Sequence, residues 1–161
     1  MEKIEELVVI FMGSKKDRSF AAGIKDELDR FGVESKVRAI SAHKAPRQAL
    51  AALEEYEGSD LNIVFIAVAG KSNALGPVLA ANSCRPVINC PPLGEFKQDI
   101  YSSLRTPGGV PCSTILEPEN AALHAVKILA TSSEELRDKL DRRRKEQKEA
   151  ILADDEAIEL N

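Results

Sequence analysis

The chain has 161 residues, of which 43% are hydrophobic and 30% are charged, and its formal net charge is −4 at pH 7. This length supports one sizeable core, so we predict a single domain over 1–132 and a C-terminal helical extension over 133–161. The acidic balance argues against nucleic acid or an anionic membrane as a partner. The longest apolar run, at 63–70, is far shorter than the about 20 residues that a membrane-spanning helix needs. Without a basic leader or an apolar signal region, the N-terminus predicts a cytoplasmic protein.

The three cysteines, Cys84, Cys90 and Cys112, are odd in number and irregular in spacing. No pair forms a CxxC motif, so we predict neither a disulfide framework nor a redox or metal motif. Buried apolar thiols in a reducing compartment are the favoured interpretation. Two histidines without a clustered ligand set predict no metal site.

Apolar runs alternate with helical patterns along most of the chain. In chain order they predict a strand at 7–11, a helix at 17–31, a strand at 33–40, a helix at 46–56, a strand at 61–69, a helix at 73–82, a strand at 86–90, a helix at 96–104, a strand at 112–116 and a helix at 118–130. Gly32 is suited to cap the first helix. Five strands with intervening helices predict an α/β fold, a three-layer, doubly wound parallel sheet of flavodoxin-like type, here with a long C-terminal helix.

The tail from Glu134 to Leu160 has the pattern of that long charged helix. Its basic run at 142–145 is interleaved with acidic residues, which favours a solvated, self-paired helix over a nucleic-acid contact. Its apolar stripe is thin. We therefore expect the far end to lie on a neighbouring subunit or to be partly frayed.

Polar residues follow the first strand at its carboxyl end. Gly13 permits a tight turn, Ser14 supplies a hydroxyl donor, and the N-terminus of the next helix favours an anion. This pattern predicts a phosphate site, although it lacks the spacing of a Walker A loop. The alternative is that Ser14 or Asp17 only caps the helix.

Ser41, His43 and Lys44 follow the second strand in the same way. Histidine ordinarily titrates near neutral pH and suits proton transfer, and Lys44 adds a positive charge for a phosphate or carboxylate. The alternative is that His43 caps the following helix. His124 lies within an amphipathic helical pattern, so we interpret it as a packing or surface residue.

A third polar turn, at 70–73, follows the third strand. The backbone amides around Gly70 could bind an anionic or polar group, and Ser72 and Asn73 could add uncharged hydrogen bonds or merely cap the next helix. Because the carboxyl ends of parallel strands meet at one edge of a sheet, the three turns together predict a ligand site there. The segments 89–93 and 102–111 are candidates to complete it.

Five motifs in this order resemble the aminoimidazole ribonucleotide (AIR) carboxylase family of purine biosynthesis: MGSKKD, SAHKAP, AVAGKSNALGPV, INCPPL and YSSLRTPGGVPCST. The resemblance covers about residues 6 to 130, and the long C-terminal helix also fits it. The family has a mutase branch, which rearranges N-carboxyaminoimidazole ribonucleotide, and a carboxylase branch, which uses carbon dioxide directly. Lys44 stands where the mutase pattern has arginine, and Ala74 where it has a second histidine, so the carboxylase branch is predicted.

This resemblance implies reversible carboxylation of ring carbon 4 of AIR, with His43 as general acid and base. It assigns nucleotide binding to positions that match the family pattern: Ser14, Asp17, Ser41, Lys44, Gly70 and Ser72. It implies no cofactor and no metal. It also implies a homo-oligomer, octamer or tetramer, in which the C-terminal helix reaches a neighbour. The alternatives are the mutase and, from another class, a non-catalytic nucleotide- or phosphate-binding regulatory module in which His43 is superfluous.

Overall fold

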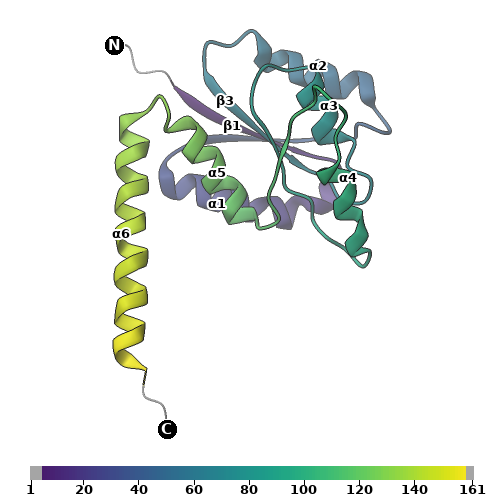
Figure 1. The fold of residues 1–161 in the computed structure, drawn as a ribbon. Coiled ribbons are helices and arrows are strands. Elements are labelled where there is room, and N and C mark those ends of the chain that lie inside the picture. Colours follow the sequence, from purple (N-terminus) through teal and green to yellow (C-terminus); the bar gives the residue numbers. More distant parts are fainter. Residues whose placement is uncertain (1–4, 159–161) are drawn as a thin grey trace.

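A computed structural model describes residues 5–158 and contains one parallel sheet (Figure 1). Its strands are β1 (Glu6–Met12), β2 (Glu34–Ala39), β3 (Asn62–Val68), β4 (Val87–Asn89) and β5 (Ser113–Thr114). They lie in the order β2-β1-β3-β4-β5 and pair in parallel throughout. This is the flavodoxin-like order, so the predicted fold class is confirmed.

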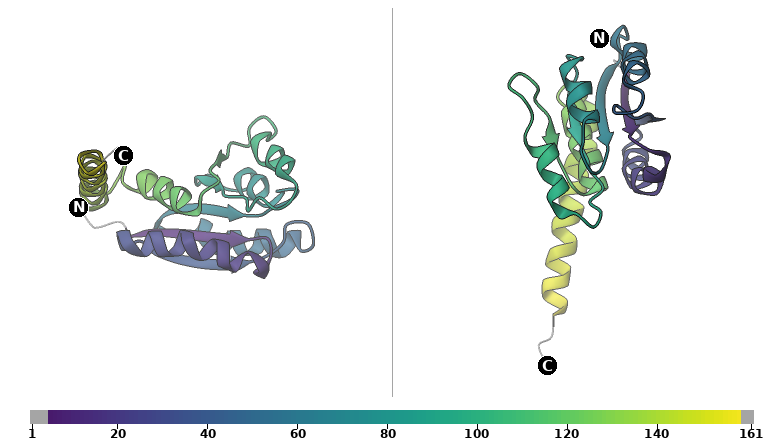
Figure 2. Two further views of the ribbon diagram at one scale, coloured as in Figure 1. Left: turned by 90° about the horizontal axis from the view of Figure 1, so that it is seen from below. Right: turned by 90° about the vertical axis from the view of Figure 1, so that its right-hand side faces the viewer.

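Helices cover both faces of this sheet, giving three layers (Figure 2). On one face, α1 (Arg18–Phe31) and α5 (Pro118–Leu129) pack on alternate strand residues such as Val8 and Ile10. On the other face, α2 (Pro46–Glu57) and α3 (Leu75–Ala81) pack on the residues between them, such as Val9. Because successive strand residues point to opposite faces, a strand covered on both sides must be apolar throughout. The continuous apolar runs of β1 and β3 have this origin.

Several element boundaries differ from the predicted ones. A 3-10 turn, η1 (Lys15–Asp17), precedes α1, and Gly32 ends that helix in the left-handed conformation (φ 69°), as predicted. The helix predicted at 73–82 begins only at Leu75. The helix predicted at 96–104 divides into a 3-10 turn, η2 (Lys97–Ile100), and one α-helical turn, α4 (Tyr101–Leu104).

The last strand is also shorter than predicted: β5 contains two residues instead of the five at 112–116. Pro111 lies two residues before β5 and has no backbone N–H, so it cannot extend the ladder as a donor. Residues 115–117 then lead directly into α5, whose first residue is Pro118.

The last helix, α6 (Glu134–Ala157), extends beyond the sheet and its covering helices (Figure 1). Ser133 caps its N-terminus by accepting a hydrogen bond from the Leu136 backbone N–H at 3.5 Å. Its N-terminal part contacts the rest of the fold: Leu136 and Leu140 pack on the core, and Arg143 forms an ion pair with Glu27 of α1. The helix continues without interruption to Ala157, and Leu160, the last residue of the predicted helix, lies outside the described residues. Within residues 5–158, no helix combines the length and apolar character that spanning a bilayer requires.

Candidate active site

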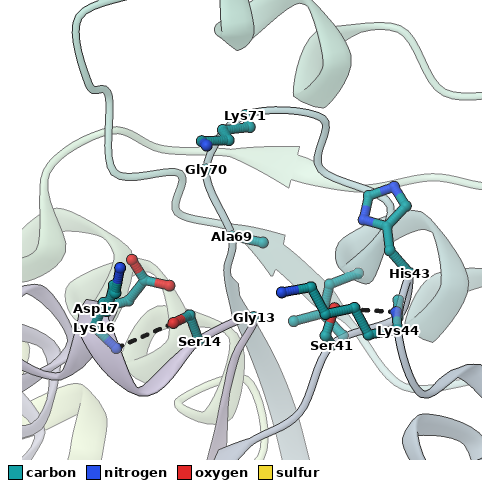
Figure 3. Close-up of a pocket in the computed structure, with 12 residues that line it drawn as sticks. Gly13, Ser14, Lys16, Asp17, Ser41, His43, Lys44, Ala69, Gly70 and Lys71 are labelled. Atoms are coloured by element: carbon teal, nitrogen blue, oxygen red, sulfur yellow. Dashed lines mark hydrogen bonds between the residues drawn. The ribbon is translucent and has the colours of Figure 1, made fainter.

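A cavity of about 400 Å³ opens at the carboxyl ends of β1, β2 and β3. This is the edge where the strand order reverses direction around β1, which is where open α/β sheets bind ligands. Figure 3 shows side chains from three separate turns converging on it. The lining residues come from those turns and from α3: Gly13, Ser14, Lys16, Asp17, Ser41, Ala42, His43, Lys44, Ala69, Gly70, Lys71 and Leu75.

The turn after β1 contributes a hydroxyl, an ammonium and a carboxyl group. Ser14 caps η1, because its Oγ accepts a hydrogen bond from the Lys16 backbone N–H at 3.2 Å. Asp17 makes no side-chain cap on α1. Burial raises the pKa of the Asp17 carboxyl, and a hydrogen bond from the Ser14 backbone offsets part of that effect. Ser14 therefore both caps η1 and lines the cavity, where its exposed side chain can contact a ligand.

The turn after β2 carries the histidine. Its start is held to β1, since the Ile40 backbone N–H donates to the Met12 carbonyl at 2.7 Å. Ser41 Oγ accepts a hydrogen bond from the Lys44 backbone N–H at 3.3 Å, which closes the turn around His43. The exposed His43 side chain does not cap α2, whose N-cap is Ala45 without a side-chain hydrogen bond. The capping alternative for His43 therefore has no counterpart in the structure.

The turn after β3 forms the third wall. Gly70 and Lys71 line the cavity, and Lys71 adopts a left-handed backbone conformation with φ 58°. Ser72 is exposed and is not a lining residue. Asn73 is buried and caps the start of α3, because its Oδ1 accepts a hydrogen bond from the Gly76 backbone N–H at 3.1 Å.

The structure thus brings six of the seven predicted site residues to one cavity and leaves Ser72 at its margin. Sequence reasoning did not single out Lys16 or Leu75. Lys16 could have been found, because it lies in the same turn as Ser14 and Asp17. Leu75 could not, because its sequence pattern is that of an ordinary core residue and only the fold brings it to the cavity. The candidate segments 89–93 and 102–111 contribute no lining residue among those described. His124 lies on α5, half-buried, with Nε2 at 3.3 Å from Ser113 Oγ.

The cysteines differ from the expected buried thiols. Cys90 is buried, and burial raises its pKa to about 12. Cys112 is half-buried and Cys84 is exposed, so the expectation is wrong for Cys84. Cys84 follows α3 in a surface turn, where the sheet no longer covers it. Within residues 5–158, no group of three or more His, Cys, Asp or Glu residues is placed to hold a metal ion.

The charges of the cavity favour an anionic ligand. Lys16, Lys44 and Lys71 carry ammonium groups, and Asp17 carries the single carboxyl among the lining residues. His43 lies across the cavity from Lys16 and Asp17 (Figure 3). A ligand whose phosphate lies at the β1 turn would therefore extend its other end toward an imidazole.

Comparison with known proteins gives consistent matches. The family model described as AIR carboxylase matches residues 7–150. "Probable multifunctional protein ADE2" of Caenorhabditis elegans is 50% identical over 125 residues, covering 77% of this chain and 30% of that protein. The chain thus spans about a third of the length of the multifunctional relatives it matches. "Phosphoribosylaminoimidazole carboxylase" of Archaeoglobus fulgidus is 41% identical over 152 residues, covering 93% of this chain and 83% of that protein.

A solved structure also matches. The crystal structure of Treponema denticola PurE has a TM-score of 0.94 and 37% sequence identity, and the match covers 97% of this chain and 100% of that chain. Shared fold, nearly complete coverage in both directions and the family model agree. The chain belongs to the AIR carboxylase family.

Proposed function

We propose that this chain is a phosphoribosylaminoimidazole carboxylase, which reversibly carboxylates ring carbon 4 of AIR with carbon dioxide in purine biosynthesis. Family membership and relatives that carry this enzyme name over most of their length support the reaction. The observation that carries the proposal is one cavity in which His43 lies opposite a cationic, hydroxyl-bearing turn. Such a site suits a phosphorylated substrate with a reactive ring at its far end.

Substrate binding is assigned to the groups that line the β1 and β2 turns. Ser14 and Lys16 suit the phosphate, since a hydroxyl and an ammonium beside a helix N-terminus favour a dianion. Asp17 and Ser41 suit the ribose hydroxyls, and Lys44 suits the carboxylate of the product. Gly70 contributes a backbone wall. Ser72, at the margin, remains a predicted substrate-binding residue.

The carboxylation itself requires a proton acceptor. The 5-amino group of AIR donates electron density to carbon 4, which attacks carbon dioxide; a carbon–carbon bond forms and one C–O π pair becomes a carboxylate lone pair. The adduct still bears a hydrogen on carbon 4. His43 removes that proton, the bonding pair returns to the ring, and aromaticity is restored. In decarboxylation the imidazolium of His43 returns the proton to carbon 4.

Carbon dioxide carries no net charge, so shape and proximity must hold it. Ala42, Ala69 and Leu75 place apolar surface in the same cavity as His43. A small apolar corner beside the reacting carbon would retain the gas and exclude bulk water from the adduct.

Assembly belongs to the same proposal. We assign α6 the role of docking on a neighbouring subunit of a homo-oligomer, because Ile151, Leu152 and Ile158 are all more than 60% exposed near its far end. Sedimentation of the full chain against a chain ending after residue 145 tests this role. A reduced oligomer in the shorter chain is expected, and an unchanged one contradicts the assignment.

The activity is tested by incubating the purified protein with carboxyaminoimidazole ribonucleotide labelled in the carboxylate. Release of labelled carbon dioxide with formation of AIR, without ATP, is expected, and the His43→Asn variant is the matched control. Formation of N-carboxyaminoimidazole ribonucleotide would instead identify the mutase. Absence of turnover with retained nucleotide binding would favour a regulatory module.

A further inference from the structure

The Lys71 turn, defined as residues 70–73, holds backbone strain at the wall of the cavity. Lys71 is the one non-glycine residue with positive φ within the described part of the chain. For a residue with a Cβ this left-handed conformation is unfavourable, and it persists only where surrounding contacts enforce it. Lys71 is also a lining residue of the cavity. The contacts that hold this turn therefore bear on ligand binding.

Ser102 of α4 supplies those contacts although it is about 30 residues further along the chain. Its Oγ lies 2.9 Å from the Lys71 carbonyl oxygen, to which it donates. The same Oγ accepts a hydrogen bond from the Asn73 backbone N–H at 3.0 Å. One hydroxyl thus bridges the residues on either side of Ser72. It also lies 2.8 Å from the Asp99 carbonyl, so the two carbonyls share its single hydrogen.

A buried network fixes the base on which this clamp acts. The Asn73 Nδ2 group donates to Asn89 Oδ1 and to Ser103 Oγ, each at 3.0 Å. All three residues are buried, with exposed fractions of 3% or less. Because buried polar groups with satisfied hydrogen bonds have few alternative arrangements, Asn73 is held in place. Ser102 then fixes the backbone conformation between Gly70 and Asn73 and its orientation toward the cavity.

We propose that Ser102 is a positioning residue for substrate binding: it clamps the Lys71 turn so that the Lys71 ammonium faces the anionic substrate. This inference rests on the proposed function for the nature of the substrate. Ser102 itself does not line the cavity, so it acts through the turn. Lys71 provides the third ammonium of the site, after Lys16 and Lys44. Together these positive charges would balance the negative charges of the substrate phosphate and the product carboxylate.

The test compares Ser102→Ala, Ser102→Thr and Lys71→Met with wild type. Loss of the hydroxyl should raise KM for carboxyaminoimidazole ribonucleotide about three- to tenfold with little change in kcat, because the interaction is one of binding rather than of the transition state. Ser102→Thr keeps the hydroxyl, so its KM should lie within about twofold of the wild-type value. Ser59→Ala, which removes a serine hydrogen bond to Leu61 N–H at the opposite end of β3, is the control and should leave KM unchanged.

A coupling measurement separates clamping from general loosening. In the Lys71→Met background, Ser102→Ala should raise KM less than about twofold further, since both changes act on one interaction. Additive effects would overturn the proposal. An unchanged KM in Lys71→Met would also overturn the proposal. The Lys71 side chain is exposed, so this substitution is expected to leave the fold intact.

Amide hydrogen exchange provides a readout that does not depend on activity. Ser102→Ala should speed exchange in a peptide covering 70–76, while peptides from β1 stay protected. Unchanged exchange there would overturn the clamp, whatever the kinetics. If wild type shows no turnover but Ser102→Ala speeds exchange, the proposed reaction fails while the clamp stands.

Discussion

Arg143 of α6 forms an ion pair with Glu27 of α1, whose side chain is completely buried. Glu27 also accepts a hydrogen bond from Arg30 at 2.9 Å, and the Arg143 guanidinium lies 5.5 Å from the centre of the Phe31 ring. Nearby, Lys139 Nζ donates to the Phe31 carbonyl at 2.8 Å. These contacts fix the direction in which α6 leaves the body.

Removing Arg143 from the Arg143–Glu27 ion pair should lower the free energy of unfolding more than removing the charge of Glu27. Arg143→Met leaves the buried Glu27 carboxylate with only the exposed Arg30, so we expect a loss of about 3 kcal/mol in the free energy of unfolding. Glu27→Gln leaves Arg143 free to turn toward water and should cost less. Urea unfolding at neutral pH measures both variants. Equal losses would contradict the assignment of Glu27 as the costly partner.

His43→Asn should lower turnover about 100- to 10,000-fold while the Kd for AIR changes little. Asparagine keeps the polar character and approximate size but cannot accept and return the proton at neutral pH. Initial rates and calorimetric binding measure the two effects. His124→Asn, the matched change on α5, should leave turnover intact. Retained turnover in His43→Asn would remove His43 from the proton transfer.

Asp17→Asn should change how stability depends on pH. Burial raises the folded-state pKa of Asp17 above 3.8, so the folded state binds its proton more tightly than the unfolded state. The wild-type free energy of unfolding therefore falls, as far as this group contributes, when pH rises from below the unfolded pKa through the folded one. Relative to wild type, Asp17→Asn should thus gain stability as the pH rises from below the unfolded-state pKa of Asp17 through its raised folded-state pKa. Urea midpoints across this pH range measure the difference, and Asp26→Asn, which changes an exposed carboxyl on α1, is the control. A stability difference between Asp17→Asn and wild type that does not change with pH would contradict the prediction.

Thiol reagents should distinguish the three cysteines in the folded protein. Cys84 is exposed and should react first. Burial raises the pKa of Cys112, which should react more slowly, and Cys90, with a pKa of about 12, should react only on unfolding. Mass spectrometry of timed samples at mildly alkaline pH identifies each product. Loss of the fast phase in Cys84→Ser checks the assignment, and early labelling of Cys90 would contradict it.

Gly76→Ala should destabilise the protein by about 1–3 kcal/mol, although alanine favours helices. A Cβ at this position would lie 1.7 Å from Asn89 Oδ1, so α3 would have to move away from β4. Gly58→Ala is the matched control, because a Cβ there meets nothing within 4 Å. Thermal unfolding of both variants gives the comparison. Similar midpoints would show that the buried network adapts to the added methyl group.

The fold class and the family were predictable from the sequence, and both predictions are confirmed. Local sequence patterns were sufficient for these predictions. Strands covered on both faces, such as β1 and β3, are apolar throughout, and polar residues mark the turns that follow them. Boundaries were less predictable in the segment 96–116. There, proline, glycine and side-chain contacts outweigh periodicity, so one expected helix divides and β5 shrinks to two residues.

The roles of the site residues remain predictions. Their meeting at one cavity could be anticipated, since carboxyl ends of parallel strands share an edge. That Ser72 is not a lining residue while Lys71 and Leu75 line the cavity depends on the geometry of the Lys71 turn, which Ser102 holds from a distance through Lys71 and Asn73.

The amino-acid sequence determines the alternating strands and helices, the polar turns and their order, because these follow from local periodicity and turn chemistry. Only the tertiary structure decides that Ser102 reaches back to the Lys71 turn and that Glu27 meets Arg143, since both contacts join segments far apart in the chain. Such pairings depend on how helices pack on the sheet. That packing is a property of the whole core, which no single segment encodes.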